Sequence, residues 1–241
     1  MLFRQLISKS GGCLTYVIGC TQAGELIIVD PRLDLVDDLM NFSELYDMRI
    51  SYIIDTHTHA DHLSGAKRLA DMTRANVYMH ESTKVKFAQK VRDNEEIKVG
   101  NVKIKFLYTP GHTPDSVSVL ITDLRRGDEP WAVLTGDTLF VGGIGRIDIG
   151  GEDSAERLFY SLQKLKVLPD YIEVFPAHTS GSACGFGISG KPSSTIGFER
   201  KYNKLFSINN KEEFINSLKS IKLPRPKEFD EIIMKNVEGN F

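Results

Sequence analysis

The chain has 241 residues, and 30 Lys plus Arg against 32 Asp plus Glu give it a formal net charge of −2. This length suits one large domain or a core with an appendage. The charge balance provides no electrostatic footprint for nucleic acid, and no apolar stretch approaches the ~20 residues that a membrane span requires. We therefore expect a protein that binds neither nucleic acid nor a membrane.

The N-terminal residues and the cysteines indicate in which cellular compartment the protein is expected. The N-terminal residues lack the charged, apolar and cleavage regions of a secretory signal. The three cysteines, Cys13, Cys20 and Cys184, give no disulfide framework, so a cytoplasmic location is expected. Cys20 is expected in the core, near the end of an early strand, and Cys13 receives no assignment.

The first half of the chain is predicted to alternate between strands and helices. In chain order these are strand, strand, helix, strand, helix and strand, at 14–19, 25–29, 34–47, 50–55, 63–73 and 76–79. The basic residues that follow are interpreted as the solvated face of a helix: Lys84, Lys86, Lys90 and Arg92.

The second half is predicted to add five strands and four helices. The strands are a hairpin across Gly100-Asn101 and three later runs, at 95–99, 102–108, 116–122, 131–135 and 171–175. The helices are 154–167, 195–205, 211–220 and 227–236. We expect residues 1–185 to form a core and residues 186–241 a helical extension packed on it, as one compact domain.

A cluster of metal-competent side chains follows the strand predicted at 50–55. His57, His59, Asp61 and His62 fall within six consecutive residues. Imidazole and carboxylate are ligands that suit zinc and non-heme iron. Crowding four such groups at a strand end without a metal would leave buried polar groups without partners. The pattern therefore predicts a metal site.

Three later strands also end in a metal-competent residue beside Gly or Pro. These residues are His112 after Gly111, Asp137 after Gly136, and His178 shortly after Pro176. Gly and Pro allow a sharp turn that directs the side chain. In open α/β sheets, ligands lie beyond the carboxyl ends of the strands. These residues are therefore expected to complete the site.

This set of residues resembles the metallo-β-lactamase superfamily in its glyoxalase II-like branch, over roughly residues 13 to 180. The resemblance implies an α/β fold, an αβ/βα sandwich with the metal site at one edge of its two sheets. In binuclear members, the positions that correspond to His57, His59 and His112 hold one metal. The positions of Asp61, His62 and His178 hold a second metal, and the position of Asp137 bridges the two.

Three segments resemble the persulfide dioxygenases of this branch: residues 135–148, 181–185 and 191–200. Glyoxalase II proteins usually have Glu-Tyr after the last histidine, whereas Thr179-Ser180 follows His178 here. The resemblance implies one Fe(II) per chain on His57, His112 and Asp137, two imidazoles and one carboxylate. The remaining members of the set would orient these ligands or hold a second metal: His59, Asp61, His62 and His178.

Several residues are candidates for catalysis or substrate binding. Asp61, His178, Arg146 and Cys184 are catalytic candidates, and the substrate-binding candidates are Arg146, Cys184, Ser193 and Arg200. Arg146 is expected to hold a substrate carboxylate or the loop after Asp137, with an ion pair to Asp148 as the alternative. For Cys184 the alternative is a small buried thiol. His80 and Trp131 are expected to be structural.

The resemblance implies oxidation of a thiol persulfide, such as glutathione persulfide, by O2 and water to sulfite and thiol. The alternative is a hydroxyacylglutathione hydrolase with two zinc ions. A diiron oxygen reductase is disfavoured, because such proteins typically have Glu at the position of His59 and a flavodoxin domain. The expected partners are the small-molecule persulfide, O2, a separate rhodanese-type sulfurtransferase and further copies of this chain in a dimer or tetramer.

Overall fold

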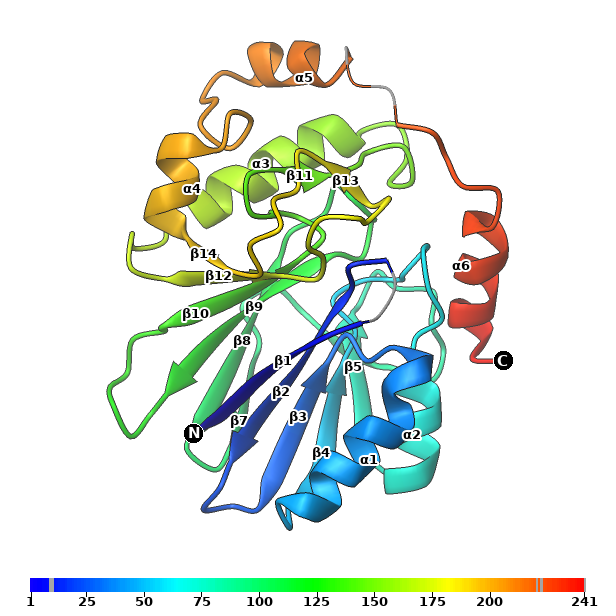
Figure 1. Ribbon diagram of the computed structural model, residues 1–241. Helices are drawn as coiled ribbons and strands as arrows, with labels where there is room; N and C mark the ends of the chain where they lie inside the picture. The colour runs from blue at the N-terminus through cyan, green and yellow to red at the C-terminus, as the bar shows by residue number, and fades with distance from the viewer. Residues whose placement is uncertain (9–10, 220, 222, 241) are drawn as a thin grey trace.

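Two facing β-sheets form the centre of the molecule, and helices cover their outer faces (Figure 1). The structure is a computed structural model that describes residues 1–8, 11–219, 221 and 223–240. Each large sheet has six strands. This arrangement confirms the predicted αβ/βα sandwich.

The first sheet follows the chain order. Its strands are β1 (Leu2–Ile7), β2 (Leu14–Cys20), β3 (Glu25–Val29), β4 (Arg49–Ile54), β5 (Asn76–His80) and β6 (Gln89–Val91). The first three strands pair antiparallel, and β3 to β6 pair parallel. Its outer face packs against the 3-10 turn η1 (Leu33–Leu35) and the helices α1 (Val36–Leu45) and α2 (Ala66–Thr73).

The second sheet has the order β14-β12-β10-β9-β8-β7. The bounds of its strands are β7 (Glu96–Val99), β8 (Val102–Tyr108), β9 (Val117–Asp123), β10 (Ala132–Gly136), β12 (Glu173–Pro176) and β14 (Ser194–Thr195). Its outer face packs against α3 (Ser154–Lys166), α4 (Ile196–Tyr202) and α5 (Lys211–Lys219). A short ribbon joins β11 (Ile144–Gly145) to β13 (Gly185–Phe186).

The last helix, α6 (Phe229–Glu238), lies apart from α3, α4 and α5 (Figure 1). From residue 223 the chain runs down one side of the molecule and brings α6 beside the end of the first sheet (Figure 1). Val237 of α6 packs against the apolar cluster that fills the space between that sheet and α2. The C-terminal segment thus contacts both halves of the sandwich.

The core between the sheets follows from strand alternation. In β3, Ile27 and Val29 face the second sheet, whereas Leu26 and Ile28 face α1 and α2. A strand that is covered on both faces is apolar at successive positions, because its side chains point alternately to the two layers. The same division holds along β2, where Val17 faces the helices and its neighbour Ile18 faces the second sheet.

Some predicted elements differ from the structure. The helix interpretation of the basic run is wrong, because Gln89–Val91 is strand β6, paired in parallel with β5. The residues between the basic side chains explain the difference, since Val85, Ala88 and Val91 are buried against the sheet. Strand β1 and the short strands β11, β13 and β14 are further elements that the pattern did not predict.

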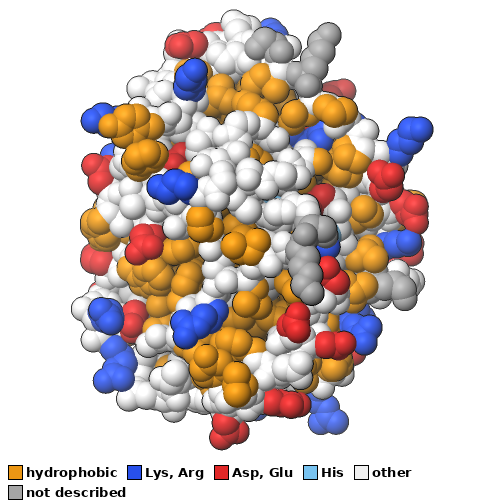
Figure 2. Space-filling model, viewed as in Figure 1, with side chains coloured by type: hydrophobic (Ala, Val, Ile, Leu, Met, Phe, Trp, Pro, Cys, Tyr) orange, Lys and Arg blue, Asp and Glu red, His pale blue; other side chains and the backbone are white. Residues whose placement is uncertain are grey.

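The surface carries charges of both signs. Basic and acidic side chains are interspersed on the face that Figure 2 shows. No helix in the described part of the chain is long and apolar enough to cross a membrane.

Candidate metal centre

The four ligand-bearing segments meet at one edge of the sandwich because each follows a strand end. The loop from Thr56 to His62, here called the histidine loop, follows β4 of the first sheet. His112, Asp137 and His178 follow β8, β10 and β12 of the second sheet. These three strands run in the same direction, since β10 pairs parallel with β12 and β9 is antiparallel to both β8 and β10.

Glycine permits the close approach of these segments at two positions. Gly136 has φ +51, and a Cβ there would lie 2.7 Å from Oγ1 of Thr56. A Cβ on Gly145 would lie 1.9 Å from the carbonyl oxygen of Asp137. A side chain at either position would therefore push the Asp137 segment away from its neighbours.

His57 is held in one tautomer. The hydroxyl of Thr56 donates to Oδ2 of Asp30 at 3.0 Å, and it lies 2.9 Å from Nδ1 of His57. Because the hydroxyl has one hydrogen, it accepts from His57, so Nδ1 carries the proton. The lone pair is then on Nε2, which faces Oδ2 of Asp137 at 3.7 Å.

His112 is oriented in the same way by a backbone carbonyl. Its Nδ1 lies 3.0 Å from the carbonyl oxygen of Arg146, which can only accept. The lone pair on Nε2 faces Oδ2 of Asp137 at 3.2 Å. Among the described residues, Nε2 of His57, Nε2 of His112 and Oδ2 of Asp137 have no hydrogen-bond partner.

The charge states of these three groups suit a cation. Burial lowers the pKa of both His57 and His112, which keeps both rings neutral. Burial opposes ionisation of Asp137, but the neighbouring His178 outweighs it and holds the pKa of Asp137 well below the usual range. The site therefore offers two neutral nitrogens and one carboxylate oxygen, a donor set that fits a divalent metal.

His178 has a different position, between two carboxylates. Its Nδ1 lies 2.8 Å from Oδ1 of Asp137, and its Nε2 lies 3.0 Å from Oδ2 of Asp61. Burial lowers the pKa of His178, but the two carboxylates outweigh this and raise it well above the ordinary value. Both ring nitrogens of His178 then donate hydrogen bonds to carboxylates. In this state the ring has no lone pair for a metal, and it orients the Asp137 carboxylate.

A thiol joins the outer part of the centre. Sγ of Cys13 lies 3.5 Å from Oδ2 of Asp61 and 3.8 Å from Nδ1 of His62, and Arg32 donates to it at 3.0 Å. Burial opposes ionisation of Cys13, but hydrogen bonds to His178 and His62 lower the pKa of the thiol to about 6. Cys13, Asp61, His62 and His178 form a second group that could hold a metal.

His59 lies against the carboxylates of Asp30 and Asp55, which the sequence motifs do not include. Its Nε2 is 3.3 Å from Oδ1 of Asp30 and 3.8 Å from Oδ1 of Asp55. Burial lowers the pKa of His59, but bonding to Asp30 outweighs this and raises it. The signal was present in the sequence, because Asp30 directly follows β3 just as Asp137 directly follows β10.

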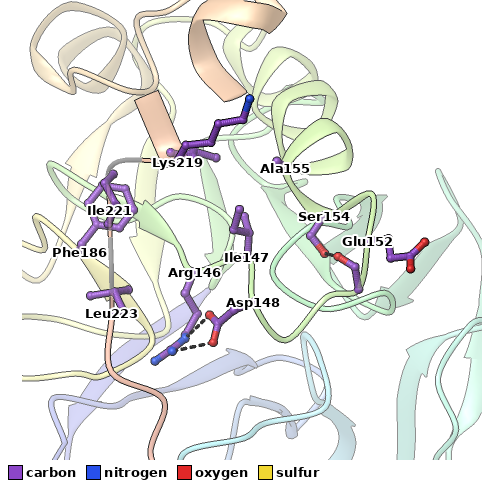
Figure 3. A pocket seen from close by; sticks show the side chains of 12 residues that line it. Arg146, Ile147, Asp148, Glu152, Ser154, Ala155, Phe186, Lys219, Ile221 and Leu223 are labelled. Atoms are coloured by element: carbon purple, nitrogen blue, oxygen red, sulfur yellow. Dashed lines mark hydrogen bonds and ion pairs between the residues drawn. The ribbon is translucent and has the colours of Figure 1, made fainter. Parts of the chain in front are cut away.

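Arg146 is almost fully buried, and its guanidinium is occupied by protein groups. It forms two hydrogen bonds with Asp148, at 2.6 and 2.7 Å (Figure 3), and donates to the carbonyl of Ala183 at 2.9 Å. The pocket of about 490 Å³ drawn in Figure 3 borders this pair. The contacts include the ion pair with Asp148 that was the alternative interpretation of Arg146.

The other candidate residues lie in several places. Cys184 has no exposed surface and can approach Asp137 and His178, and burial raises the pKa of its thiol well above 9.0. Arg200 contacts Asp170 and the carbonyls of Lys166 and Leu168 at the end of α3. Ser193 directly precedes β14 and is half-buried.

The residues expected to be structural lie in apolar or stacked surroundings. His80 stacks on Tyr108 with ring centroids 3.8 Å apart. Trp131 packs beside Phe3 and Phe175, and Cys20 is a buried member of the core between the sheets. These positions confirm the expectations.

An open pocket of about 610 Å³ reaches the centre from outside. Asp61 and His62 line it together with residues of η1, of α6 and of the turn before α6. Charged groups of both signs line it: Arg32, Asp34, Glu228, Glu231 and Lys235. A small charged molecule could therefore reach the edge of the metal centre.

Comparison with known proteins identifies the family. The model of the metallo-β-lactamase superfamily matches residues 9–178. The chain belongs to the metallo-β-lactamase superfamily. A metallo-β-lactamase structure from Staphylococcus aureus is 36% identical with a TM-score of 0.91, covering 99% of this chain and 72% of that one.

Other similar members of the superfamily have more specific names. The structure of ETHE1 from Myxococcus xanthus is 32% identical, with a TM-score of 0.88 and full coverage of both chains. The mitochondrial persulfide dioxygenase ETHE1 of Homo sapiens is 26% identical over 98% of this chain and 88% of its own length. BaeB of Bacillus velezensis, described as a probable zinc-dependent hydrolase of polyketide biosynthesis, is 30% identical over 83% of this chain and 84% of its own. The two ETHE1 matches confirm the predicted resemblance to persulfide dioxygenases.

Proposed function

We propose that this protein is an iron-dependent persulfide dioxygenase. The reaction converts R–S–SH, O2 and H2O into R–SH, sulfite and two protons. The observation that carries the proposal is the group of two neutral imidazoles and one carboxylate directed at one point, which leaves further positions of an octahedral ion open. The similarity to proteins named persulfide dioxygenase supports the same reaction.

The residues of the centre would have distinct roles. His57, His112 and Asp137 would hold one Fe(II), which supplies the binding and activation of O2. His178 would keep the Asp137 carboxylate oriented. Asp61 contacts His178 and also borders the open pocket. The pair would therefore pass a proton to the departing thiol.

The pocket beside Asp61 would bind the thiol carrier. Its cationic and anionic side chains suit a carrier that has both carboxylate and ammonium groups, such as glutathione. A separate rhodanese-type sulfurtransferase would be a source of the persulfide. The proposed location is the cytoplasm, and the proposed assembly is a dimer or tetramer.

Oxygen uptake and metal content test the proposal together. Protein purified without oxygen and loaded with Fe(II) should contain about one iron per chain. Glutathione persulfide should then cause oxygen uptake with sulfite as the product, and an iron chelator should stop it. The matched control is His112→Ala, which should neither retain iron nor consume oxygen. Iron-loaded protein that consumes no oxygen with any low-molecular-weight persulfide would refute the proposal.

A zinc-dependent hydrolase of glyoxalase II type is the second candidate. It is favoured by the second group of possible ligands, Cys13, Asp61, His62 and His178, and by the similarity to BaeB. Two zinc ions could polarise water for thioester hydrolysis. Hydrolysis of S-lactoylglutathione by protein with two zinc ions, without persulfide-dependent oxygen uptake, would establish this alternative.

A further inference from the structure

One side chain of α6 makes two hydrogen bonds with the histidine loop and a third with Ser64, two residues beyond it. Asn236 is buried, with 5% of its surface exposed. Its Oδ1 accepts from the backbone N–H of Ser64 at 2.9 Å. Its Nδ2 donates to the carbonyl oxygens of His59 and His62, each at 2.9 Å. The amide thus bridges three backbone groups across six residues of the metal-bearing segment.

These contacts match the hydrogen-bonding capacity of an amide group. The two N–H bonds of Asn236 meet two acceptors, and its carbonyl meets one donor. His59 and His62 lie outside the strands, and among the described residues no backbone N–H donates to their carbonyl oxygens. A buried backbone group without a partner is costly. Asn236 therefore supplies the donors that these two carbonyls would otherwise lack.

The first residue of α6 contacts the loop whose backbone orients His112. The guanidinium of Arg146 lies 5.1 Å from the ring centroid of Phe229, the first residue of α6. The same guanidinium donates to the carbonyl of Pro224 at 3.3 Å. The backbone carbonyl of Arg146 holds Nδ1 of His112. One helix thus contacts segments that orient ligands from both sheets.

We propose that Asn236 is a positioning residue of the metal centre, fixing the backbone of the histidine loop so that its side chains meet those of the second sheet. The inference depends on the metal site and not on persulfide oxidation. Its test therefore uses metal binding, and failure of the proposed reaction would leave it unaffected.

The affinity for Co(II) tests the proposal, measured on the full chain by competition with a chelator. Asn236→Leu keeps the size of the side chain but removes all three hydrogen bonds. It should raise the dissociation constant for Co(II) about 10–100-fold, the scale for groups that orient metal ligands. At saturating Co(II), the visible absorption bands should differ from those of the wild type, because the ligand geometry differs. An unchanged dissociation constant, or weaker binding with unchanged saturated bands, would overturn the proposal.

Two further variants separate positioning from general loss of stability. Met234→Ala changes an exposed residue of the same helix and should leave both the affinity and the bands unchanged. Asn236→Asp keeps the acceptor for Ser64 but turns an oxygen toward the carbonyls of His59 and His62. It should weaken Co(II) binding as much as Asn236→Leu does. Wild-type affinity and bands in Asn236→Asp would overturn the role assigned to these two carbonyl contacts.

Discussion

His57 and His112 both direct Nε2 toward Oδ2 of Asp137. They do so because each ring donates its Nδ1–H to a fixed acceptor. For His57 the acceptor is the hydroxyl of Thr56, which Asp30 orients, and for His112 it is the carbonyl of Arg146. Such partners determine the tautomer and the direction of the lone pair. His178 has carboxylates on both nitrogens instead, and in the proposed centre this difference makes it a supporting group and not a ligand.

Substitution should distinguish the two kinds of residue. His57→Ala, His112→Ala and Asp137→Ala should each abolish iron binding, because each removes one of three ligands. His178→Ala and Asp61→Ala should retain iron and lower affinity or activity by roughly 10–100-fold. Metal analysis after dialysis, together with steady-state rates, would check this. Equal loss of metal in all five variants would point to a binuclear centre.

A role for Cys184 in handling persulfide sulfur would depend on the protonation state of its thiol. Burial raises the pKa of its thiol, and a thiol is a weaker nucleophile than a thiolate. We therefore expect Cys184→Ala to keep turnover of a low-molecular-weight persulfide within about threefold and to cost roughly 1 kcal/mol of stability. Steady-state kinetics and urea unfolding would measure both. A large loss of turnover in Cys184→Ser with normal iron content would instead establish a role in persulfide handling.

At the scale of elements, helix α3 supports the loop that carries His112. Gly111 has φ +143, and a Cβ there would lie 2.5 Å from Cα of Leu158 in α3. Leu158 has no exposed surface and belongs to the apolar cluster under the second sheet. The helix backbone and the loop therefore touch directly, without a side chain between them.

Gly111→Ala should disturb both partners of this contact. We expect the free energy of unfolding to fall by about 3 kcal/mol, because the added methyl meets buried backbone that cannot move away easily. Metal affinity should fall as well, since His112 is the next residue. Gly127→Ala is the control, because a Cβ there has no atom within 4 Å among those described, and it should change stability by less than about 0.5 kcal/mol. Equal urea midpoints for the two variants would contradict this account of the contact.

At the scale of the whole molecule, the metal centre joins the two sheets. His57 comes from the first sheet, whereas His112 and Asp137 come from the second. A metal held by all three would cross-link the halves of the sandwich. It would bind the folded chain much better than the unfolded one, where these residues are far apart.

Removal of the metal should therefore lower thermal stability. With free metal at about 100 times its dissociation constant, the folded state gains about 2.7 kcal/mol. That gain corresponds to about 5–10 °C in Tm for a chain of this size. Calorimetry of metal-free and metal-loaded protein would measure the shift. His112→Ala should show no such rise, and an equal rise in this variant would place the stabilising metal elsewhere.

The sequence by itself determined the layered α/β class and predicted the residues that meet at the candidate metal centre. The reason is that both depend on local patterns: apolar runs of strand length, and metal-competent residues placed directly after them beside Gly or Pro. His57, His112 and Asp137 could be found in this way because each follows a strand end. The same local logic failed for the basic run at 84–92, because strand β6 depends on its pairing with β5 and on the burial of Val91.

Only the tertiary structure decided which groups support the ligands. Arg146 holds His112 through its backbone carbonyl, a contact that does not depend on its side chain and leaves no pattern in the sequence. Asn236 and Cys13 meet the histidine loop from 174 and 49 residues away. Hydrogen bonds and ion pairs act through space at about 3 Å, so contacts between segments so far apart exist only once the two sheets and α6 have packed together.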